Sequence, residues 1–105
     1  MRCGEVWWAR LPAPAGRRPV VLLSRDESYA VRALVTVAPV TTRVRGLPVE
    51  VPLGIAEGLD RACVANADTV TTIAKANLEE RAGHLGPAKV AELNRALRFA
   101  LGMGR

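Results

Sequence analysis

The sequence is short of the residues on which many enzyme mechanisms depend. Its 105 residues include one histidine and two cysteines, and aromatic residues make up only 4% of the chain. The single histidine, His84, excludes a mechanism that uses two histidines of one chain. Cys3 and Cys63 form neither a CxxC motif nor a zinc-binding spacing, so we expect two free thiols.

Several motifs of cofactor and nucleophile sites are also missing. The chain contains no P-loop, no GxGxxG and no GxSxG, so it offers no cradle for a nucleotide cofactor and no serine placed for acyl transfer. His, Asp and Glu do not cluster at the spacing of metal ligands, and we therefore expect neither a metal nor a cofactor. Charged residues, Pro and Gly interrupt every apolar run, and the N-terminus lacks a secretory segment, so a cytoplasmic location without membrane contact is expected.

The residues that are present predict one compact domain over residues 1–105. Hydrophobic residues make up 50% of the chain and charged residues 24%, which is enough apolar material for a core and argues against disorder. Because aromatic residues are few, this core must be built mainly from Val, Leu and Ala.

Positive charge is concentrated in the first half of the chain. The formal net charge is +5, and arginine supplies nearly all the positive residues. Residues 1–50 hold eight of these arginines against four carboxylates; the arginines are Arg2, Arg10, Arg17, Arg18, Arg25, Arg32, Arg43 and Arg45. Guanidinium groups match phosphate oxygens, so a nucleic acid is a candidate partner. A soluble protein that is merely rich in arginine would show the same composition.

The hydrophobic pattern predicts short strands followed by one helix. Apolar or alternating segments indicate strands at residues 4–11, 19–24, 34–40, 47–53, 62–67 and 69–73. Residues 25–28 could form one helical turn, and Pro52 marks residues 47–53 as an edge strand. After the start signal Gly86-Pro87, apolar residues recur every three or four positions up to Leu101. The fold class expected is a small β-rich barrel closed by a C-terminal helix.

Arg18 and Thr41 are the residues that could carry chemistry. Arg18 precedes the strand at residues 19–24, and Thr41 follows the strand at residues 34–40, so both can lie on one rim of an antiparallel barrel. A guanidinium beside a hydroxyl can bind a phosphate and stabilise added charge on it. Cleavage of RNA needs no protein nucleophile, because the attacking 2′-hydroxyl belongs to the substrate. Taken alone, both short strings could equally be structural.

The ordered set of segments resembles the MazF/PemK family of toxin endoribonucleases. The resemblance extends from Gly4 to Leu101, and the order and spacing of the segments are more specific than any one of them. They are GEVWWA (4–9), RRPVVLLS (17–24), VAPVTT (37–42), GLPVEV (46–51), NADTVTTI (66–73) and GHLGP (83–87).

This resemblance implies a fold, an activity and partners. The fold is an SH3-like β-barrel of the MazF/CcdB type with a C-terminal helix, assembled as a homodimer. The activity is metal-independent cleavage of single-stranded RNA, restrained by a cognate antitoxin. Arg18 matches the family's catalytic arginine and Thr41 its catalytic threonine. The residues expected to contact RNA are Arg17, Arg43, Arg45, Asp68 and Thr69.

Departures from the family pattern leave some questions open. The segment at residues 11–16 is a short Pro/Ala loop without a carboxylate, so the general base could be water, Thr41 or the partner chain. On a strand, Trp7 and Trp8 would point to opposite faces, and we expect one in the core and the other half-exposed, where it could stack on a base. The alternative function is a non-enzymatic barrel of the same superfamily, either a gyrase-binding toxin like CcdB or a degenerate RNA-binding relative.

Overall fold

The computed structural model describes residues 1–104, so Arg105 of the predicted domain lies outside the described residues. In chain order, the strands and α-helices of this range are β1 (Glu5–Arg10), β2 (Arg17–Leu22), α1 (Ser28–Val31), β3 (Leu34–Thr41), β4 (Glu50–Leu53), β5 (Cys63–Asn66), β6 (Thr71–Ala74), β7 (Leu78–His84) and α2 (Pro87–Leu101). Three single 3-10 turns precede β5, β6 and β7: η1 (Ile55–Glu57), η2 (Ala67–Thr69) and η3 (Lys75–Asn77).

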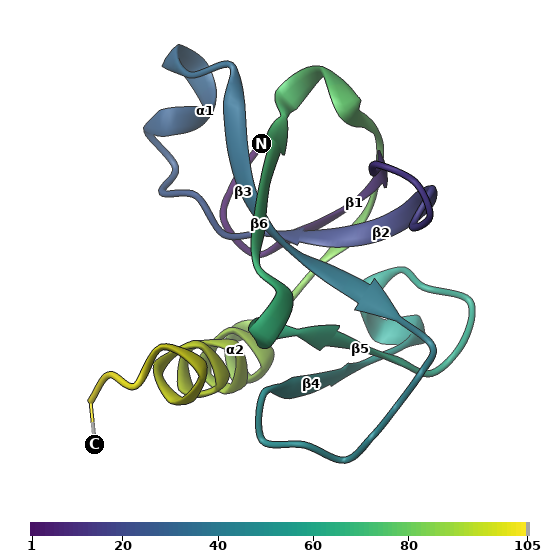
Figure 1. Ribbon diagram of the computed structural model, residues 1–105, viewed down its shortest axis with the longest axis vertical. Helices are drawn as coiled ribbons and strands as arrows, with labels where there is room; N and C mark the ends of the chain where they lie inside the picture. The colour runs from purple at the N-terminus through teal and green to yellow at the C-terminus, as the bar shows by residue number, and fades with distance from the viewer. Residues whose placement is uncertain (105) are drawn as a thin grey trace.

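The strands form one antiparallel sheet that curls on itself. Its order is β4-β5-β3-β2-β1-β7, and β6 pairs with β3 beside this path. The first half of β3 pairs with β6, its middle with β2 and its end with β5, so this long strand crosses the whole molecule (Figure 1). The result is a mainly β half-barrel with a C-terminal helix, which confirms the predicted fold class.

The central strands are buried on both faces. Val20 and Leu22 of β2 pack in one hydrophobic cluster with residues of β3 and β6, whereas Val21 packs in a second cluster with β4, β5 and α2. Such burial requires a continuous apolar run, as the sequence of β2 predicts. Helix α2 covers the second cluster with Leu93 and Ala96.

Helix α2 has the bounds that the sequence predicts. Pro87 occupies its first turn, and Gly102 ends it with φ of 69°, a left-handed conformation that glycine adopts without strain. The only other α-helix in residues 1–104 is α1, which begins at Ser28. The turn predicted at residues 25–28 is closed by the N–H of Ser28, which donates to the carbonyl oxygen of Arg25 at 3.0 Å, and it leads into α1.

The strand predicted at residues 19–24 begins and ends two residues earlier, so Arg18 lies inside β2, and Thr41 is the last residue of β3. One other predicted strand is shorter, and one strand was missed. Residues 47–49 precede β4, which pairs only with β5 and is the edge strand that Pro52 indicated. Strand β7 was not predicted, because its sequence LEERAGH has neither an apolar run nor an alternating pattern. It is also an edge strand, held by the backbone ladder to β1. Among the described residues, no helix is long and apolar enough to cross a membrane.

Candidate functional site

Arg18 and Thr41 line a common opening beyond the end of the β2–β3 ladder. The last paired residues of the two strands are Val20 and Pro39, and Pro19 comes next on β2. Neither proline has an N–H to donate, so the ladder stops and the two strands separate at this point. Beyond this point Arg18 stays paired with Ala9 of β1 and Thr41 with Val64 of β5, and both residues line the same two pockets.

Local hydrogen bonds orient both side chains and leave donors free. The Nε of Arg18 donates to the carbonyl oxygen of Ala15 at 3.0 Å, which leaves the terminal nitrogens of the guanidinium available. The backbone N–H of Arg43 donates to the hydroxyl of Thr41 at 3.1 Å, so this hydroxyl keeps its own hydrogen for another acceptor. Both residues are half-buried. The pair therefore presents a charged fork and a hydroxyl donor to the same opening.

Two pockets meet at this pair, and both are lined by Arg18, Val40 and Thr41. One, of about 350 Å³, also contains Arg43, Arg45, Glu50, Asn66 and Thr69, and we name it the basic pocket. The other, of about 240 Å³, also contains Trp8, Pro19, Thr42, Leu59, Asp60, Arg61 and Cys63, and we name it the indole pocket. An elongated ligand that lies across Arg18 and Thr41 can thus enter a pocket on each side of the pair.

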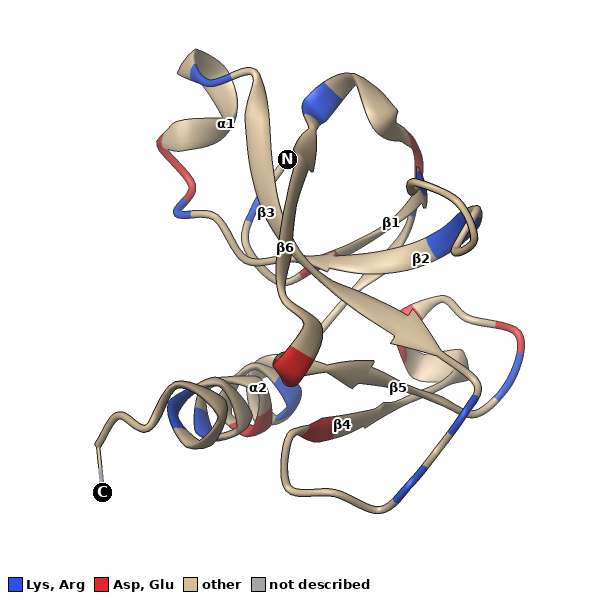
Figure 2. Ribbon diagram, viewed as in Figure 1, with Lys and Arg blue, Asp and Glu red and all other residues tan. Residues whose placement is uncertain are grey.

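Glu50 holds the loop that carries the two arginines of the basic pocket. Its carboxylate accepts from the backbone N–H groups of Arg45, Gly46 and Leu47 at 2.8–3.3 Å. Desolvation would raise the pKa of Glu50, but these N–H donors oppose it and hold the pKa below its ordinary value. Blue segments mark the basic residues of this loop between β3 and β4, close to the red start of β4 (Figure 2).

The predicted RNA-contact residues are not all brought together. Arg43, Arg45 and Thr69 line the basic pocket. Asp68 does not line either pocket; its exposed backbone N–H donates to the side-chain oxygen of Asn66 at 2.8 Å. Arg17 also lies outside both linings.

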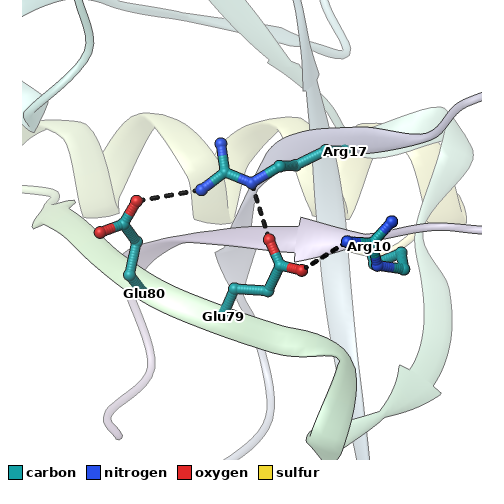
Figure 3. A network of polar contacts seen from close by, with 4 residues as sticks. All are labelled: Arg10, Arg17, Glu79 and Glu80. Atoms are coloured by element: carbon teal, nitrogen blue, oxygen red, sulfur yellow. Dashed lines mark hydrogen bonds and ion pairs between the residues drawn. The ribbon is translucent and has the colours of Figure 1, made fainter.

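Arg17 belongs to a polar network on the outer surface of the sheet. Its guanidinium pairs with Glu79 at 2.7 Å and with Glu80 at 3.0 Å, and Arg10 completes the network at 3.1 Å from Glu79 (Figure 3). The hydrogen bond from Arg17 and the charge of Arg10 hold the pKa of Glu79 below its ordinary value. Arg17 also lies 4.6 Å from the ring centre of Trp8. The positive charge of Arg17 is therefore already met by carboxylates and by an aromatic face.

The side chains of Trp7 and Trp8 point to different sides of the strand, as predicted, but their burial does not differ as predicted. Trp7 packs against the cluster that contains Val20 and Leu22, whereas Trp8 lines the indole pocket. Both side chains are half-buried, so the prediction of one core tryptophan was wrong. The indole N–H of Trp7 explains this position, because it donates to Glu5 at 2.9 Å near the surface.

Several side chains of the site were not predicted. Glu50 and Asn66 in the basic pocket lie in the segments GLPVEV and NADTVTTI but were given no role, and Asp60 and Arg61 in the indole pocket lie outside every segment that carries the resemblance. The carboxylate of Glu50, two residues before Pro52, could have been recognised as an acceptor for the preceding glycine-containing turn. Asp60 and Arg61 carry no such signal, because only the fold places them near Arg18.

The arrangement suits binding of a phosphate between two pockets. No described group of three or more His, Cys, Asp and Glu side chains lies close enough to hold a metal ion. His84 is exposed at the end of β7, with Nδ1 3.5 Å from Arg81, and it lines neither pocket. The chemistry available at the centre is therefore that of a guanidinium and a hydroxyl, which bind an anion and stabilise charge developing on it.

Comparisons with known proteins agree in sequence and in structure. A protein of Mycobacterium tuberculosis named "Probable endoribonuclease MazF5" is 39% identical over 103 residues, which cover 97% of this chain and 94% of that protein. The solved structure "Mycobacterium tuberculosis toxin MazF-mt6" matches with a TM-score of 0.90 at 33% identity, over 96% of this chain and 99% of the other. A structure titled "Endoribonuclease in complex with its cognate antitoxin from Mycobacterial species" matches with a TM-score of 0.88 at 28% identity, over 100% and 98%.

These matches confirm the predicted likeness to the MazF/PemK family and its barrel. The family's sequence model, described as "PemK-like, MazF-like toxin of type II toxin-antitoxin system", matches residues 2–101. The chain belongs to the PemK-like, MazF-like family of type II toxin–antitoxin toxins.

Proposed function

We propose that this protein is a metal-independent endoribonuclease toxin that cleaves single-stranded RNA. The observation that carries the proposal is the juxtaposition of Arg18 and Thr41 across the end of the β2–β3 ladder, with a pocket on each side. The names of the relatives, which are endoribonucleases, support the same activity.

In this proposal the substrate supplies the nucleophile. The 2′-oxygen attacks the adjacent phosphorus, the bond from phosphorus to the 5′-oxygen breaks, and the products end in a 2′,3′-cyclic phosphate and a 5′-hydroxyl. The proton of the 2′-hydroxyl passes to a base, for which water, Thr41 and the partner chain remain the candidates, and the departing 5′-oxygen takes a proton from water. The free nitrogens of Arg18 stabilise the charge that develops on the phosphoryl oxygens. The hydroxyl of Thr41 donates to one of these oxygens and holds the phosphate in line with the attack.

The remaining predicted residues have roles in binding. Arg43 and Arg45 meet backbone phosphates in the basic pocket, and Thr69 lies at the same wall. We keep Asp68 and Arg17 as RNA-contact residues at the margin of the site; Glu79 and Glu80 bind Nε and Nη2 of Arg17, so Nη1 is the nitrogen that would meet a phosphate.

Membership of the family supports a proposal for the partners and the cellular location. We propose a homodimer in the cytoplasm, with residues 1–105 acting as one toxin domain. A cognate antitoxin would restrain the enzyme, as in the mycobacterial relative whose structure is titled as a complex with its cognate antitoxin.

The decisive experiment is incubation of the purified protein with a mixed-sequence single-stranded RNA in EDTA. We expect cleavage at discrete sites, with 2′,3′-cyclic phosphate ends identified by mass spectrometry. Loss of one charge-stabilising donor commonly lowers a rate by about 10²–10³. Arg18→Ala and Thr41→Val should each show a loss of this size while the circular dichroism spectrum stays unchanged.

A matched control is Thr71→Val, because Thr71 is exposed on β6, lines neither pocket and should tolerate loss of its hydroxyl. Full activity of both Arg18→Ala and Thr41→Val would place the site elsewhere. Absence of cleavage by the wild-type protein, with RNA or gyrase binding retained, would favour the non-enzymatic alternatives.

A further inference from the structure

The indole pocket is not explained by binding of the scissile phosphate alone. It shares Arg18 and Thr41 with the basic pocket, but Trp8, Asp60 and Arg61 come from parts of the chain that do not contribute to the basic pocket. Trp8 belongs to β1, and Asp60 with Arg61 follow η1. The pocket therefore combines an aromatic ring, a second guanidinium and a carboxylate in about 240 Å³.

The segment that carries Asp60 and Arg61 is held in place by backbone contacts. Gly58 and Gly83 lie so close that a Cβ on either would collide with the backbone of the opposite segment. Glu57, itself buried, accepts from the N–H of Gly54 at 2.7 Å and closes the turn before this contact. Leu59 is only 5% exposed, so the wall of the pocket is anchored immediately before Asp60.

Trp8 is also held in a defined position. Arg17 covers one face of its ring at 4.6 Å, and Glu79 and Glu80 fix the guanidinium of Arg17 from the other strand (Figure 3). One face of the indole is thus occupied, and only the opposite face or the ring edge can meet a ligand in the pocket. A ring that is already ordered loses little entropy when a base packs against it.

Arg61 keeps most of its charge available. Its Nε lies 3.7 Å from Asp60, and the two side chains are 70% and 84% exposed. An exposed ion pair at this distance contributes little to the stability of the protein, and a phosphate can displace Asp60 from Arg61. Asp60 would repel a phosphate but can accept a hydrogen bond from a ribose hydroxyl or from the amino group of a base.

We infer that the indole pocket is a subsite for the nucleotide next to the scissile phosphate on the side away from the basic pocket. Its base packs against Trp8, its phosphate contacts Arg61, and Asp60 accepts from its ribose or base. This inference rests on the proposed cleavage at Arg18 and Thr41, and it adds the residues that position the RNA on the second side of the cut.

The test measures binding of an uncleavable RNA that carries a 2′-deoxynucleotide at a mapped cleavage position. Affinity is determined by fluorescence anisotropy over a series of salt concentrations, for the wild type and for Arg61→Ala. One phosphate contact to a single strand contributes about 0.7 to the slope of log K against log salt. Arg61→Ala should lower the slope by about this amount, whereas a change of stability alone would not.

A matched control is Arg2→Ala, because Arg2 is 79% exposed, pairs loosely with Asp26 at 4.0 Å and lines neither pocket. Two shortened RNAs locate the subsite: one keeps only the nucleotides on the 5′ side of the scissile phosphate, and the other keeps only those on its 3′ side. The effect of Arg61→Ala should disappear with one of them and persist with the other. With the wild type, an abasic nucleotide at the position so identified should weaken binding about tenfold, through loss of the packing on Trp8.

The inference is wrong if Arg61→Ala behaves like Arg2→Ala on the full-length RNA, or if its effect persists with both shortened RNAs. It is equally wrong if the abasic nucleotide binds as well as the intact one. These outcomes leave the proposed function standing as long as Arg18→Ala still abolishes cleavage. Failure of the wild-type protein to bind any of the RNAs would instead contradict both.

Discussion

At the scale of single residues, Arg18 and Thr41 each make one hydrogen bond to the backbone and retain donors for a ligand. The Nε of Arg18 donates to the carbonyl oxygen of Ala15, and the hydroxyl of Thr41 accepts from the backbone N–H of Arg43. Glu50 differs, because three backbone N–H groups occupy its carboxylate and leave it little role except to order the arginine loop. Positioning and binding are thus divided between neighbouring residues of one pocket.

Glu50→Gln should loosen the loop that carries Arg43 and Arg45. The variant loses the charge that strengthens the three N–H contacts. We expect trypsin to cut after Arg43 and Arg45 about tenfold faster than in the wild type, which mass spectrometry of the fragments would measure. The rate of cutting after Arg61 serves as the control. Equal rates in both proteins would mean that the carboxylate does not order this loop.

The same contact has a defined dependence on pH. Because the pKa of Glu50 is lowered in the folded protein, its stabilising effect is complete above the pKa of the unfolded chain and is lost as pH falls through the folded value. Acidification should therefore release the wild-type loop but have no such effect in Glu50→Gln.

At the scale of elements, two prolines and two glycines shape the site. Pro19 and Pro39 end the ladder between β2 and β3, which separates the strands at Arg18 and Thr41. Gly58 and Gly83 allow the turn after β4 to lie directly on β7, which brings Asp60 and Arg61 to the edge of the indole pocket. Both effects depend on the absence of an atom, an amide hydrogen in one case and a Cβ in the other.

Gly83→Ala should destabilise the protein, because the new Cβ would collide with the backbone carbonyl of Glu57. Overpacking of this kind costs about 1–3 kcal/mol, and a backbone neighbour has little freedom to move away. Gly86→Ala is the control, since Gly86 has open space around its Cα and φ of −72°. Its cost as a helix N-cap should stay below about 1 kcal/mol. Urea unfolding measures both, and similar free energies of unfolding for the two variants would contradict the close contact.

At the scale of the whole molecule, part of the excess positive charge is concentrated in the basic pocket. The net charge is +5, and Arg18, Arg43 and Arg45 line the basic pocket with Glu50 as its one carboxylate. Glu50 is engaged by backbone donors, so the pocket favours an anionic ligand. An inhibitor that occupies the same positions needs carboxylates for the guanidiniums and apolar side chains for the pocket walls.

A cognate antitoxin should therefore compete directly with RNA. We expect its affinity to fall as salt is raised, and Arg43→Glu or Arg45→Glu should weaken the binding of both inhibitor and RNA. Isothermal titration of the inhibitor into the free enzyme and into enzyme saturated with uncleavable RNA measures the competition. Equal affinity in the two titrations would place the inhibitory contact away from the Arg18–Thr41 opening.

Local patterns of the sequence were enough to predict the central strands and helix α2, whereas they marked Arg18 and Thr41 only as candidates. The predicted apolar run supplies the buried end of β2, Val20–Leu22, and α2 has both its start and stop signals, so burial and capping are encoded within a few residues. Resemblance to the family then assigned roles to Arg18 and Thr41. These features depend on chemistry that a short segment carries by itself.

Other features were decided only by the tertiary structure. Strand β7 has a polar sequence and exists because its backbone completes the ladder of β1. Arg17 turns to Glu79 and Glu80, which lie more than sixty residues away in the chain. Asp60 and Arg61 join the site through the contact of two glycines from different segments. Each of these depends on which backbones lie side by side, and that is determined by the register and curvature of the whole sheet.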